Sequence, residues 1–253
     1  MVKKPIYFSI FILLFTLLGC AEKHTQTIRI ATAANMQYAM RELIKEFSAH
    51  HKIGCDMIVS SSGKLTGQIT AGAPYDIFVS ADMKYPEEIF EKGLSFEKPK
   101  VYAYGQLVLW TTTDSISPTL ETLKQDHIQH IAVANPKTAP YGVAAMQVLD
   151  KYDLMNDLKE KLVYGESIAQ TNQFITSKAA EIGFTAKSVV LSPTMKNQGN
   201  YTEIDEKAYD RIRQGIVRIK RTDAENKNTR IFYNFIFSPE AQQILKTNGY
   251  AIP

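Results

Sequence analysis

Hydrophobic residues along the chain follow two spacings that alternate with each other. Short runs rich in β-branched residues predict strands, and apolar residues three or four apart predict amphipathic helices. Strands are expected at residues 28–33, 57–59, 76–79, 104–110, 130–134, 181–185 and 215–220. Helices are expected at residues 39–47, 65–71, 86–92 and 141–149, and over most of 224–245. Strands that alternate with helices indicate an α/β fold, with parallel strands and helices on both faces of the sheet.

The beginning of the chain has a different pattern. Lys3 and Lys4 precede an apolar run over residues 6–18, which is shorter than the roughly 20 residues that cross a bilayer as a helix. Such a run is typical of a secretory signal peptide, and a retained membrane helix is the less favoured alternative. The run ends in Leu-Leu-Gly-Cys at residues 17–20, which resembles a bacterial lipobox. We therefore expect residues 1–19 to be removed and Cys20 to carry a lipid.

The removal of this signal changes the charge and cysteine counts that bear on function. Residues 20–26 are interpreted as a tether between the lipid and the folded part. Without Lys3 and Lys4, the 29 basic residues fall to 27 against 26 acidic ones, a net charge of +1. This balance gives no support for a nucleic-acid partner. With Cys20 lipidated, Cys55 is left alone, so no disulfide is expected within the chain and Cys55 is interpreted as a buried structural thiol.

Four loops of the expected fold have a composition that suits an anion. In α/β sheets, ligands lie beyond the carboxyl ends of the strands, where loops lead into helices. The loops are residues 33–36, 60–63, 139–142 and 165–168. They are made mainly of small and hydroxyl residues, and Glu166 is their one charge. Helix N-termini expose unpaired backbone N–H groups, so several that converge can bind an anion without Arg or Lys.

Two side chains in these loops have two interpretations that the sequence leaves open. Asn35 and Ser62 can each add a side-chain donor to an anion site. Asn and Ser are also common N-cap residues of helices, which would make both purely structural.

Motifs of common enzyme classes do not occur in the chain. Lys64 follows Ser-Ser-Gly, but Ile58 stands where a phosphate loop requires glycine. There is no Gly-x-Ser-x-Gly nucleophile elbow. We therefore expect a binding protein and not an enzyme, with no cofactor.

The candidate metal ligands are also weak. His50 and His51 are adjacent near the end of an expected helix, and His127 and His130 have no third ligand nearby in sequence. We expect no direct protein ligands to a metal. Asp76 and Asp82 are interpreted as a structural residue and a helix cap.

Several segments resemble the molybdate-binding proteins of bacterial ABC importers. The most specific is Ala-Gly-Ala-Pro-Tyr-Asp-Ile-Phe-Val-Ser-Ala-Asp at residues 71–82. Further matching segments are residues 30–35, 39–40, 61–65, 139–142, 182–184, 239–242 and 249–250. The resemblance covers essentially the whole mature chain. It implies a two-lobed, hinged periplasmic-binding-protein fold of type II, in which each lobe has a mixed, mostly parallel sheet flanked by helices.

The resemblance also implies the division of the chain and the place of the ligand. Lobe 1 would comprise residues 27–103 and 215–253, and lobe 2 residues 104–214. The strands at 104–110 and 215–220 would cross between the lobes, with the ligand in the cleft.

Five ligand positions follow from the same resemblance. They are Asn35, Ser62, Tyr141, Ile168 and Ala186. Ile168 would donate its backbone N–H, because its side chain has no donor. The best-known members have a serine at the position of Asn35 and a tyrosine at that of Ala186.

The missing hydroxyl at Ala186 leaves one ligand oxygen without a donor. We expect Tyr141, or Gln170 and Thr171, to supply it. Ser61 is a further candidate for contact with the ligand.

A site built from neutral donors favours a fully ionised tetrahedral anion, because desolvating a dianion is costly unless every oxygen is matched. Hydrogen phosphate carries a proton and needs an acceptor. The implied function is capture of molybdate or tungstate and delivery to the membrane permease of an ABC importer. The protein would be an exported, monomeric lipoprotein, periplasmic or on the cell surface, anchored to the membrane through the lipid on Cys20.

Three alternatives remain beside this function. The chain could bind another tetrahedral oxyanion such as sulfate on the same fold. It could be an enzyme on a hinged α/β scaffold, for which the sequence offers no catalytic constellation. A ligand-sensing regulatory domain is a further alternative, and the export signal argues against it.

Overall fold

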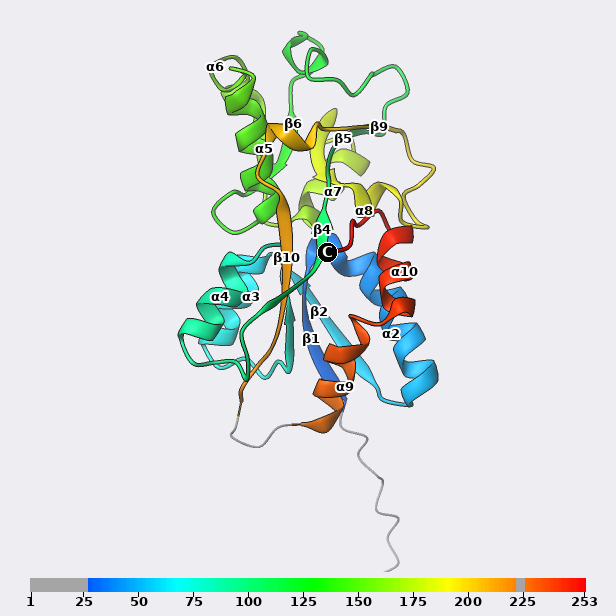
Figure 1. Cartoon of the computed structure of the whole chain (residues 1–253). Helices are drawn as coiled ribbons and strands as arrows, with labels where there is room; N and C mark the ends of the chain where they lie inside the picture. Colours follow the sequence, from blue (N-terminus) through cyan, green and yellow to red (C-terminus); the bar gives the residue numbers. More distant parts are fainter. Residues whose placement is uncertain (1–26, 222–225) are drawn as a thin grey trace, which may run out of the picture.

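The computed structural model describes residues 27–221 and 226–253, which fold into two lobes (Figure 1). The predicted signal peptide, Cys20 and the tether lie outside the described residues. In the part of the chain that the structure describes, no helix is both long enough and apolar enough to cross a membrane.

Lobe 1 is built on a sheet with the strand order β2-β1-β3-β10-β4. Its strands are β1 (Ile28–Ala33), β2 (Cys55–Ser60), β3 (Ile77–Val79), β4 (Lys100–Gly105) and β10 (Ile212–Arg218). β1 pairs in parallel with β2 and β3, while β10 is antiparallel to β3 and β4. The helices are η2 (Ala34–Met36), α2 (Gln37–His51), α3 (Ser62–Thr70), α4 (Lys84–Glu91), α9 (Lys227–Phe235) and α10 (Pro239–Thr247).

Lobe 2 has a second sheet with the order β7-β6-β8-β5-β9. Its strands are β5 (Leu107–Thr111), β6 (Ile131–Ala134), β7 (Leu162–Gly165), β8 (Ile182–Ala186) and β9 (Asn200–Glu203). β6 is parallel to β7 and β8, whereas β5 is antiparallel to β8 and β9. The helices are η3 (Thr122–Lys124), α5 (Pro140–Lys151), α6 (Met155–Leu158), η4 (Lys159–Lys161), α7 (Ile168–Thr176), α8 (Lys187–Val190) and η5 (Glu206–Ala208).

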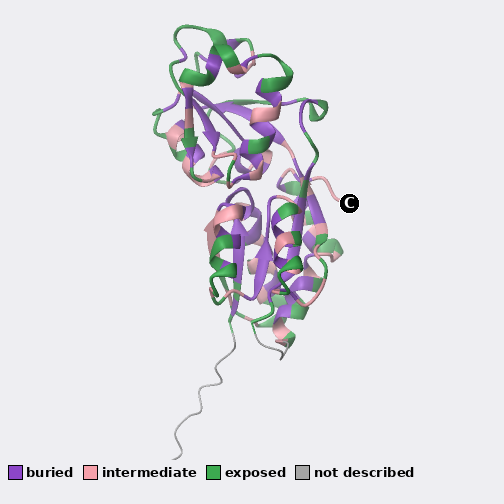
Figure 2. Cartoon of the chain, turned by 90° about the vertical axis from the view of Figure 1, so that its left-hand side faces the viewer, coloured by how far each residue is buried: buried purple, intermediate pink, exposed green. Residues whose placement is uncertain are grey.

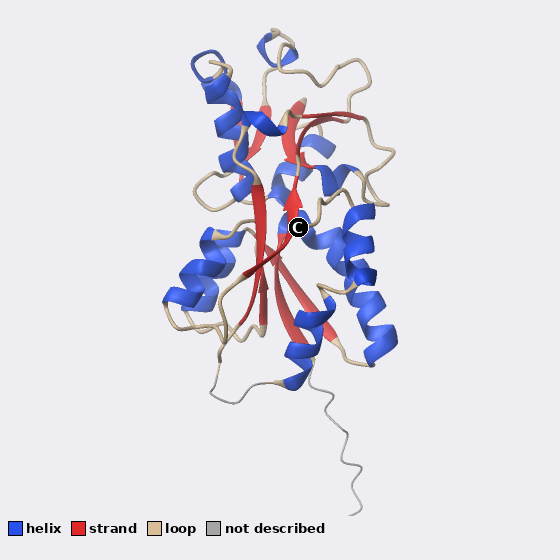
Figure 3. Ribbon diagram, in the orientation of Figure 1, coloured by secondary structure: helices blue, strands red, loops and turns tan. Residues whose placement is uncertain are grey.

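The two lobes are joined where β4 leads into β5 and where the chain returns along β10 (Figure 3). The single crossing strand predicted at 104–110 is two strands, separated at Gln106. Residues before Gln106 pair with β10 in lobe 1, and residues after it pair with β8 and β9 in lobe 2. β10 begins earlier than predicted and contains a register shift between Gln214 and Gly215.

Each sheet carries its own apolar core along the strands (Figure 2). The helical face predicted from residues 39–47 is confirmed: Met40, Leu43 and Phe47 are fully buried in α2. The ring of Phe47 meets that of Phe232 on α9 edge-on, with centroids 4.9 Å apart. The C-terminal half of α2 and α9 therefore pack together beside the same sheet.

One apolar cluster crosses between the lobes. Ala33, Ala34 and Ala81 of lobe 1 belong to the same buried cluster as Tyr141 and Ile168 of lobe 2. The carboxyl ends of the lobe 1 strands are therefore packed directly against the helix starts of lobe 2.

Cys55 differs from its interpretation as a buried thiol, because it is only partly buried. It lies at the start of β2, where one face of the strand is less covered than expected. Burial nevertheless raises the pKa of its thiol to about 12, so the group stays protonated.

Candidate oxyanion site

A small cavity lies between the lobes, where four helices begin. It is lined by Ala33, Ala34, Asn35, Ser61, Ser62, Ala81, Ala139, Pro140, Tyr141 and Ile168. All of these residues are uncharged, and all but Ala81 come from the four loops singled out in the sequence, each of which contributes at least one. The free space inside is small. The lining residues therefore approach one another closely around a single centre.

The helix starts present backbone donors to this cavity. The first N–H groups of a helix have no acceptor within the helix. Ser62 and Ile168 are the first residues of α3 and α7, and Tyr141 is the first residue of α5 with an N–H, since Pro140 has none. Among the described residues, no side chain caps the starts of η2, α3 or α5. Each start also carries partial positive charge from the helix dipole, so the cavity favours an anion.

The interpretation of Asn35 and Ser62 as N-caps is wrong. The N-cap of α3 is Ser61, and Asn35 lies inside η2, whose N-cap is Ala33. Ser62 lies one position and Asn35 two positions beyond the N-cap of its helix, so their backbone N–H groups are among the unpaired ones.

Ser62 and Ser61 differ in what their hydroxyls do. The Oγ of Ser62 accepts the backbone N–H of Ala81 at 3.0 Å, which leaves its own hydrogen to donate. The Oγ of Ser61 is fully buried and has no hydrogen-bond partner in the part of the chain that the structure describes. A buried hydroxyl without a partner costs about 1–3 kcal/mol. An anion oxygen in the cavity would provide the acceptor that Ser61 lacks.

The side chain of Asn35 is directed into a polar network behind the cavity. Its Nδ2 donates to Oε1 of Gln214 at 3.0 Å and to the hydroxyl of Tyr250 at 3.1 Å. Both amide hydrogens therefore have acceptors, and the sequence-based expectation of a side-chain donor to the ligand does not fit this arrangement. The remaining donor of Asn35 is its backbone N–H.

Gln214 is the centre of this network. Its Oε1 also accepts the hydroxyl of Tyr102 at 2.8 Å, and its Nε2 donates to the hydroxyl of Tyr141 at 3.1 Å. The hydroxyl of Tyr250 lies 3.0 Å from Oγ of Ser188, which donates to the carbonyl of Asn35 at 2.9 Å. All of these side chains are buried. The network joins β4, β10 and the C-terminal segment to α5 and α8 of lobe 2.

The network carries no charge at neutral pH. Burial raises the pKa of the phenols of Tyr102, Tyr141 and Tyr250 above the ordinary value, so all three stay protonated. The carboxyl group of Asp82 directly follows Ala81, which lines the cavity. Burial raises the pKa of Asp82 to about 6. It accepts the hydroxyl of Ser80 at 3.1 Å and the N–H of Tyr85 at 3.3 Å, which supports the first turn of α4.

Three of the predicted ligand residues lie outside the cavity lining. Ala186 is fully buried at the end of β8. The hydroxyl of Thr171 donates to the carbonyl of Ser167 at 3.0 Å, and Oε1 of Gln170 accepts the N–H of Glu166 at 2.7 Å. These two side chains are thus used within the first turn of α7, while Ser61 and Ser62 supply the hydroxyls that line the cavity.

The lobes also meet in a second set of contacts, made by α3 and α4 of lobe 1. The N–H of Gly63 donates to the carbonyl of Thr138 at 2.9 Å. The hydroxyl of Tyr85 donates to the carbonyl of Lys137 at 3.2 Å. An exposed ion pair between Lys64 and Glu166 crosses the same boundary.

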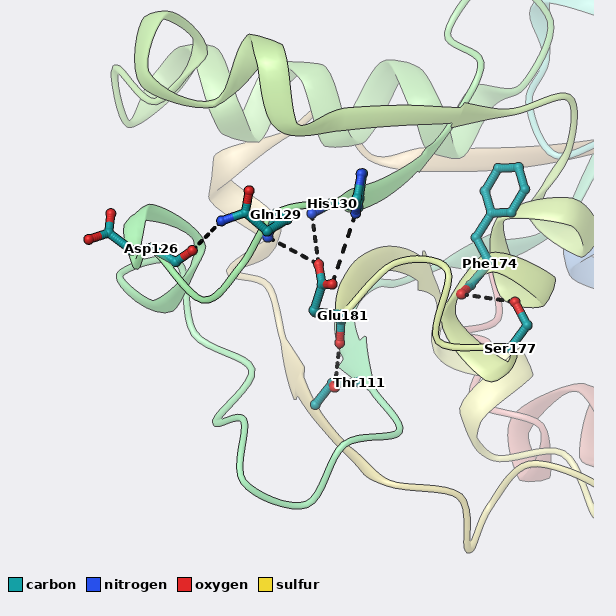
Figure 4. A network of polar contacts seen from close by, with 7 residues as sticks. All are labelled: Thr111, Asp126, Gln129, His130, Phe174, Ser177 and Glu181. Carbon is teal, nitrogen blue, oxygen red and sulfur yellow. Dashed lines mark hydrogen bonds and ion pairs between the residues drawn. The ribbon is translucent and has the colours of Figure 1, made fainter.

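One of the candidate metal ligands, His130, lies beside Glu181. The carboxylate of Glu181 accepts the backbone N–H groups of Gln129 at 3.1 Å and His130 at 2.7 Å, and it lies 3.9 Å from the ring of His130 (Figure 4). The hydroxyl of Thr111 donates to the backbone carbonyl of Glu181 at 2.6 Å. Glu181 thus fixes the start of β6. Within residues 27–221 and 226–253, no group of three or more His, Cys, Asp or Glu side chains could hold a metal ion.

The sequence is similar to characterised transport proteins over nearly its whole length. Residues 28–251 match the family described as bacterial extracellular solute-binding protein. The molybdate-binding protein ModA of Azotobacter vinelandii is 34% identical over 93% of this chain and 94% of its own length. That of Rhodobacter capsulatus is 33% identical over 87% and 86%.

The fold comparison agrees with the sequence comparison. The solved structure of the Azotobacter vinelandii periplasmic molybdate-binding protein superposes with a TM-score of 0.84 and 32% identity, over 89% of this chain and 99% of that one. The predicted two-lobed α/β fold and the resemblance to molybdate-binding proteins are thereby confirmed.

Proposed function

This chain belongs to the bacterial extracellular solute-binding proteins, and we propose that it captures molybdate, or tungstate, in the cavity between its lobes. The observation that carries the proposal is the meeting of uncapped helix starts from both lobes around a buried, uncharged cavity that also holds the unpartnered hydroxyl of Ser61. The relatives with the highest identity given above are named as molybdate-binding proteins.

The chemistry of the cavity fits a dianion that carries no proton. The backbone N–H groups of Asn35, Ser62, Tyr141 and Ile168 and the hydroxyls of Ser61 and Ser62 would donate to the oxygens. The partial positive charges at several helix starts would offset the two negative charges without a lysine or arginine. Because the lining offers donors, hydrogen phosphate would leave its proton without an acceptor, and its binding would be weaker.

The division of the donors between lobes suggests how capture works. Asn35 and the two serines belong to lobe 1, whereas Tyr141 and Ile168 belong to lobe 2. An ion held by one lobe alone would keep part of its hydration, and closing of the lobes would replace that water with fixed donors. In this proposal the protein performs no catalysis and uses no cofactor.

The remaining parts of the proposal concern the place of the protein in the cell. We propose that it is exported, that Cys20 carries the lipid that anchors it, and that the monomer delivers its ion to the permease of an ABC importer. A Cys20→Ser variant should leave the membrane fraction. If this variant stays with the membranes to the same extent as wild type, the lipid anchor is wrong.

Thermal unfolding of the mature, unlipidated protein tests the ligand. Molybdate and tungstate should each raise the midpoint, and a ligand at about 1,000 times its dissociation constant stabilises the folded state by roughly 4 kcal/mol. Sulfate and phosphate at the same concentrations should raise it less. A midpoint that rises with sulfate or phosphate and not with molybdate would contradict the proposed ligand.

A further inference from the structure

Gly63 of lobe 1 approaches Thr138 of lobe 2 closely. It is the second residue of α3, and its N–H donates to the carbonyl of Thr138 at 2.9 Å. A Cβ atom at Gly63 would lie 3.0 Å from the Cα of Thr138 and 2.7 Å from the hydroxyl oxygen of Tyr85. Contacts this short force one of the partners to move.

The backbone of Gly63 gives no reason for a glycine. The glycines with positive φ are Gly72, Gly93, Gly199 and Gly249, so Gly63 has a conformation that any residue can adopt. Alanine has a higher helix propensity than glycine. Helix propensity alone would therefore favour alanine at position 63. The close approach of Thr138 leaves no room for its side chain.

Gly67, one turn later in α3, provides the contrast. A Cβ atom there would meet nothing within 4 Å. Gly63 is thus packed against Thr138 of the other lobe and Tyr85 of its own, whereas Gly67 of the same helix is open.

The neighbours of this contact are residues that line the cavity. Ser62 directly precedes Gly63, and Ala139, Pro140 and Tyr141 directly follow Thr138. The segment before Ala139 is also held from lobe 1 by the bond between Tyr85 and the carbonyl of Lys137. The distance between Gly63 and Thr138 thus fixes how far the donors of lobe 1 lie from those of lobe 2.

We propose that Gly63 is a positioning residue for the bound anion: its missing side chain lets the lobes close to the distance at which both sets of donors reach one ion. A methyl group at this position holds the loop of Thr138 back by a few tenths of an ångström, and the donors of Tyr141 retreat with it. This inference rests on the proposed function, because it needs an anion shared by the two lobes.

The test compares Gly63→Ala with Gly67→Ala in the mature protein. Molybdate affinity and dissociation rate are measured by titration calorimetry and by displacement, and the unliganded thermal midpoint is measured in parallel. Gly63→Ala should weaken molybdate binding about tenfold or more, the scale of an overpacked contact. Most of this loss should come from faster dissociation. Gly67→Ala should bind as wild type does, and neither variant should lower the unliganded midpoint.

A second background separates the contacts that the added methyl group makes with the two lobes. Tyr85 lies in the same lobe as Gly63, and its hydroxyl oxygen and ring carbon Cζ would lie 2.7 and 3.0 Å from the added Cβ, so a collision with this ring would disturb α3 and α4 without involving closure. In the Tyr85→Leu background both atoms are gone, and Gly63→Ala should still weaken binding relative to Tyr85→Leu alone. If Gly63→Ala binds like Gly67→Ala, or if its effect disappears in the Tyr85→Leu background, the inference is overturned.

Failure of the proposed ligand gives a different result. A wild-type protein that binds sulfate and not molybdate contradicts the ligand but leaves the geometry at Thr138 intact. The same comparison of variants, made with sulfate, then tests the role of Gly63. Gly63→Ala should again weaken binding, and Gly67→Ala should not.

Discussion

Gln214 donates a hydrogen bond of 3.1 Å from its side-chain amide to the hydroxyl of Tyr141, and so links the returning strand β10 to the first turn of α5 in the other lobe. The absence of a side chain at Gly105 makes room for this bond, since a Cβ atom there would lie 2.1 Å from the Tyr141 oxygen and 2.5 Å from Nε2 of Gln214. β10, one of the strands that join the lobes, is thus in direct contact with a residue that lines the cavity.

Replacement of Gln214 by methionine should be strongly destabilising. Methionine has a similar length, but it removes the hydrogen bonds of Gln214 to the buried polar groups of Asn35, Tyr102 and Tyr141. The loss of each such bond costs about 1 kcal/mol, so we expect the free energy of unfolding to fall by roughly 3 kcal/mol in urea titrations. The exposed Gln243→Met is the matched control, with little expected change. Equal effects of the two substitutions would show that the network adds no stability.

Ser61→Ala and Ser62→Ala should separate binding from folding. Ser61 has no partner for its buried hydroxyl among the described residues, so alanine should leave the unliganded protein as stable or slightly more stable. Ser62→Ala removes the acceptor for the N–H of Ala81 and should cost about 1 kcal/mol.

In the same pair of variants, molybdate affinity should fall about tenfold or more, because hydrogen bonds to charged groups are the stronger ones. Calorimetric titration and denaturant unfolding measure the two effects. A Ser61→Ala variant that binds molybdate as tightly as wild type would exclude this hydroxyl from the site.

The ion pair between Lys64 and Glu166 should contribute little to binding. Their side chains are 40% and 67% exposed, and exposed pairs are worth about 0–1 kcal/mol. Lys64→Met should therefore weaken molybdate binding by less than about fivefold, and the difference from wild type should vanish in 1 M salt.

Lys92→Met is the control for this ion pair. Lys92 pairs with Glu88 at 2.6 Å with similar exposure, but both residues belong to lobe 1. This variant should not change affinity at any salt concentration. A Lys64→Met effect that persists in 1 M salt would indicate a role other than electrostatic attraction between the lobes.

Asp82 should make stability depend on pH in the acid range. Burial raises its pKa from 3.8 to about 6, so folding favours the neutral carboxyl. The stability that this group contributes is fully present below pH 3.8 and is lost as the pH rises through 6. Relative to Asp82→Asn, wild type should lose about 3 kcal/mol between these limits. Urea unfolding at several pH values measures this difference, and parallel curves for the two proteins would contradict it.

The sequence predicted the elements and the loops that line the cavity because both depend on local pattern. The strand at 28–33 and the helix at 141–149 have strong periodicity, and the structure has them as Ile28–Ala33 and Pro140–Lys151. The four loops share a composition of small and hydroxyl residues, and the parallel strands bring them together at one edge of each sheet.

The polar network around Gln214 could not be predicted from the sequence. Asn35 bonds to Gln214, which is 179 residues away, and to Tyr250, which is 215 residues away. No periodicity connects such positions, and a glutamine near a predicted strand is most often exposed. For the same reason the sequence left open whether the side chain of Asn35 donates to the ligand or caps a helix, whereas its amide bonds to Gln214 and Tyr250 behind the cavity.

The C-terminal segment also contacts the region where the lobes join. Tyr104 and Ala251 exchange two backbone hydrogen bonds, of 2.7 and 3.0 Å, and the hydroxyl of Tyr250 reaches both Asn35 and Ser188. A fluorescent group attached after Pro253 would therefore lie beside the junction of the lobes, while one attached ahead of β1 would lie at the far end of lobe 1 (Figure 1). The C-terminus is thus the natural position for an optical reporter of the proposed closure of the lobes on the ion.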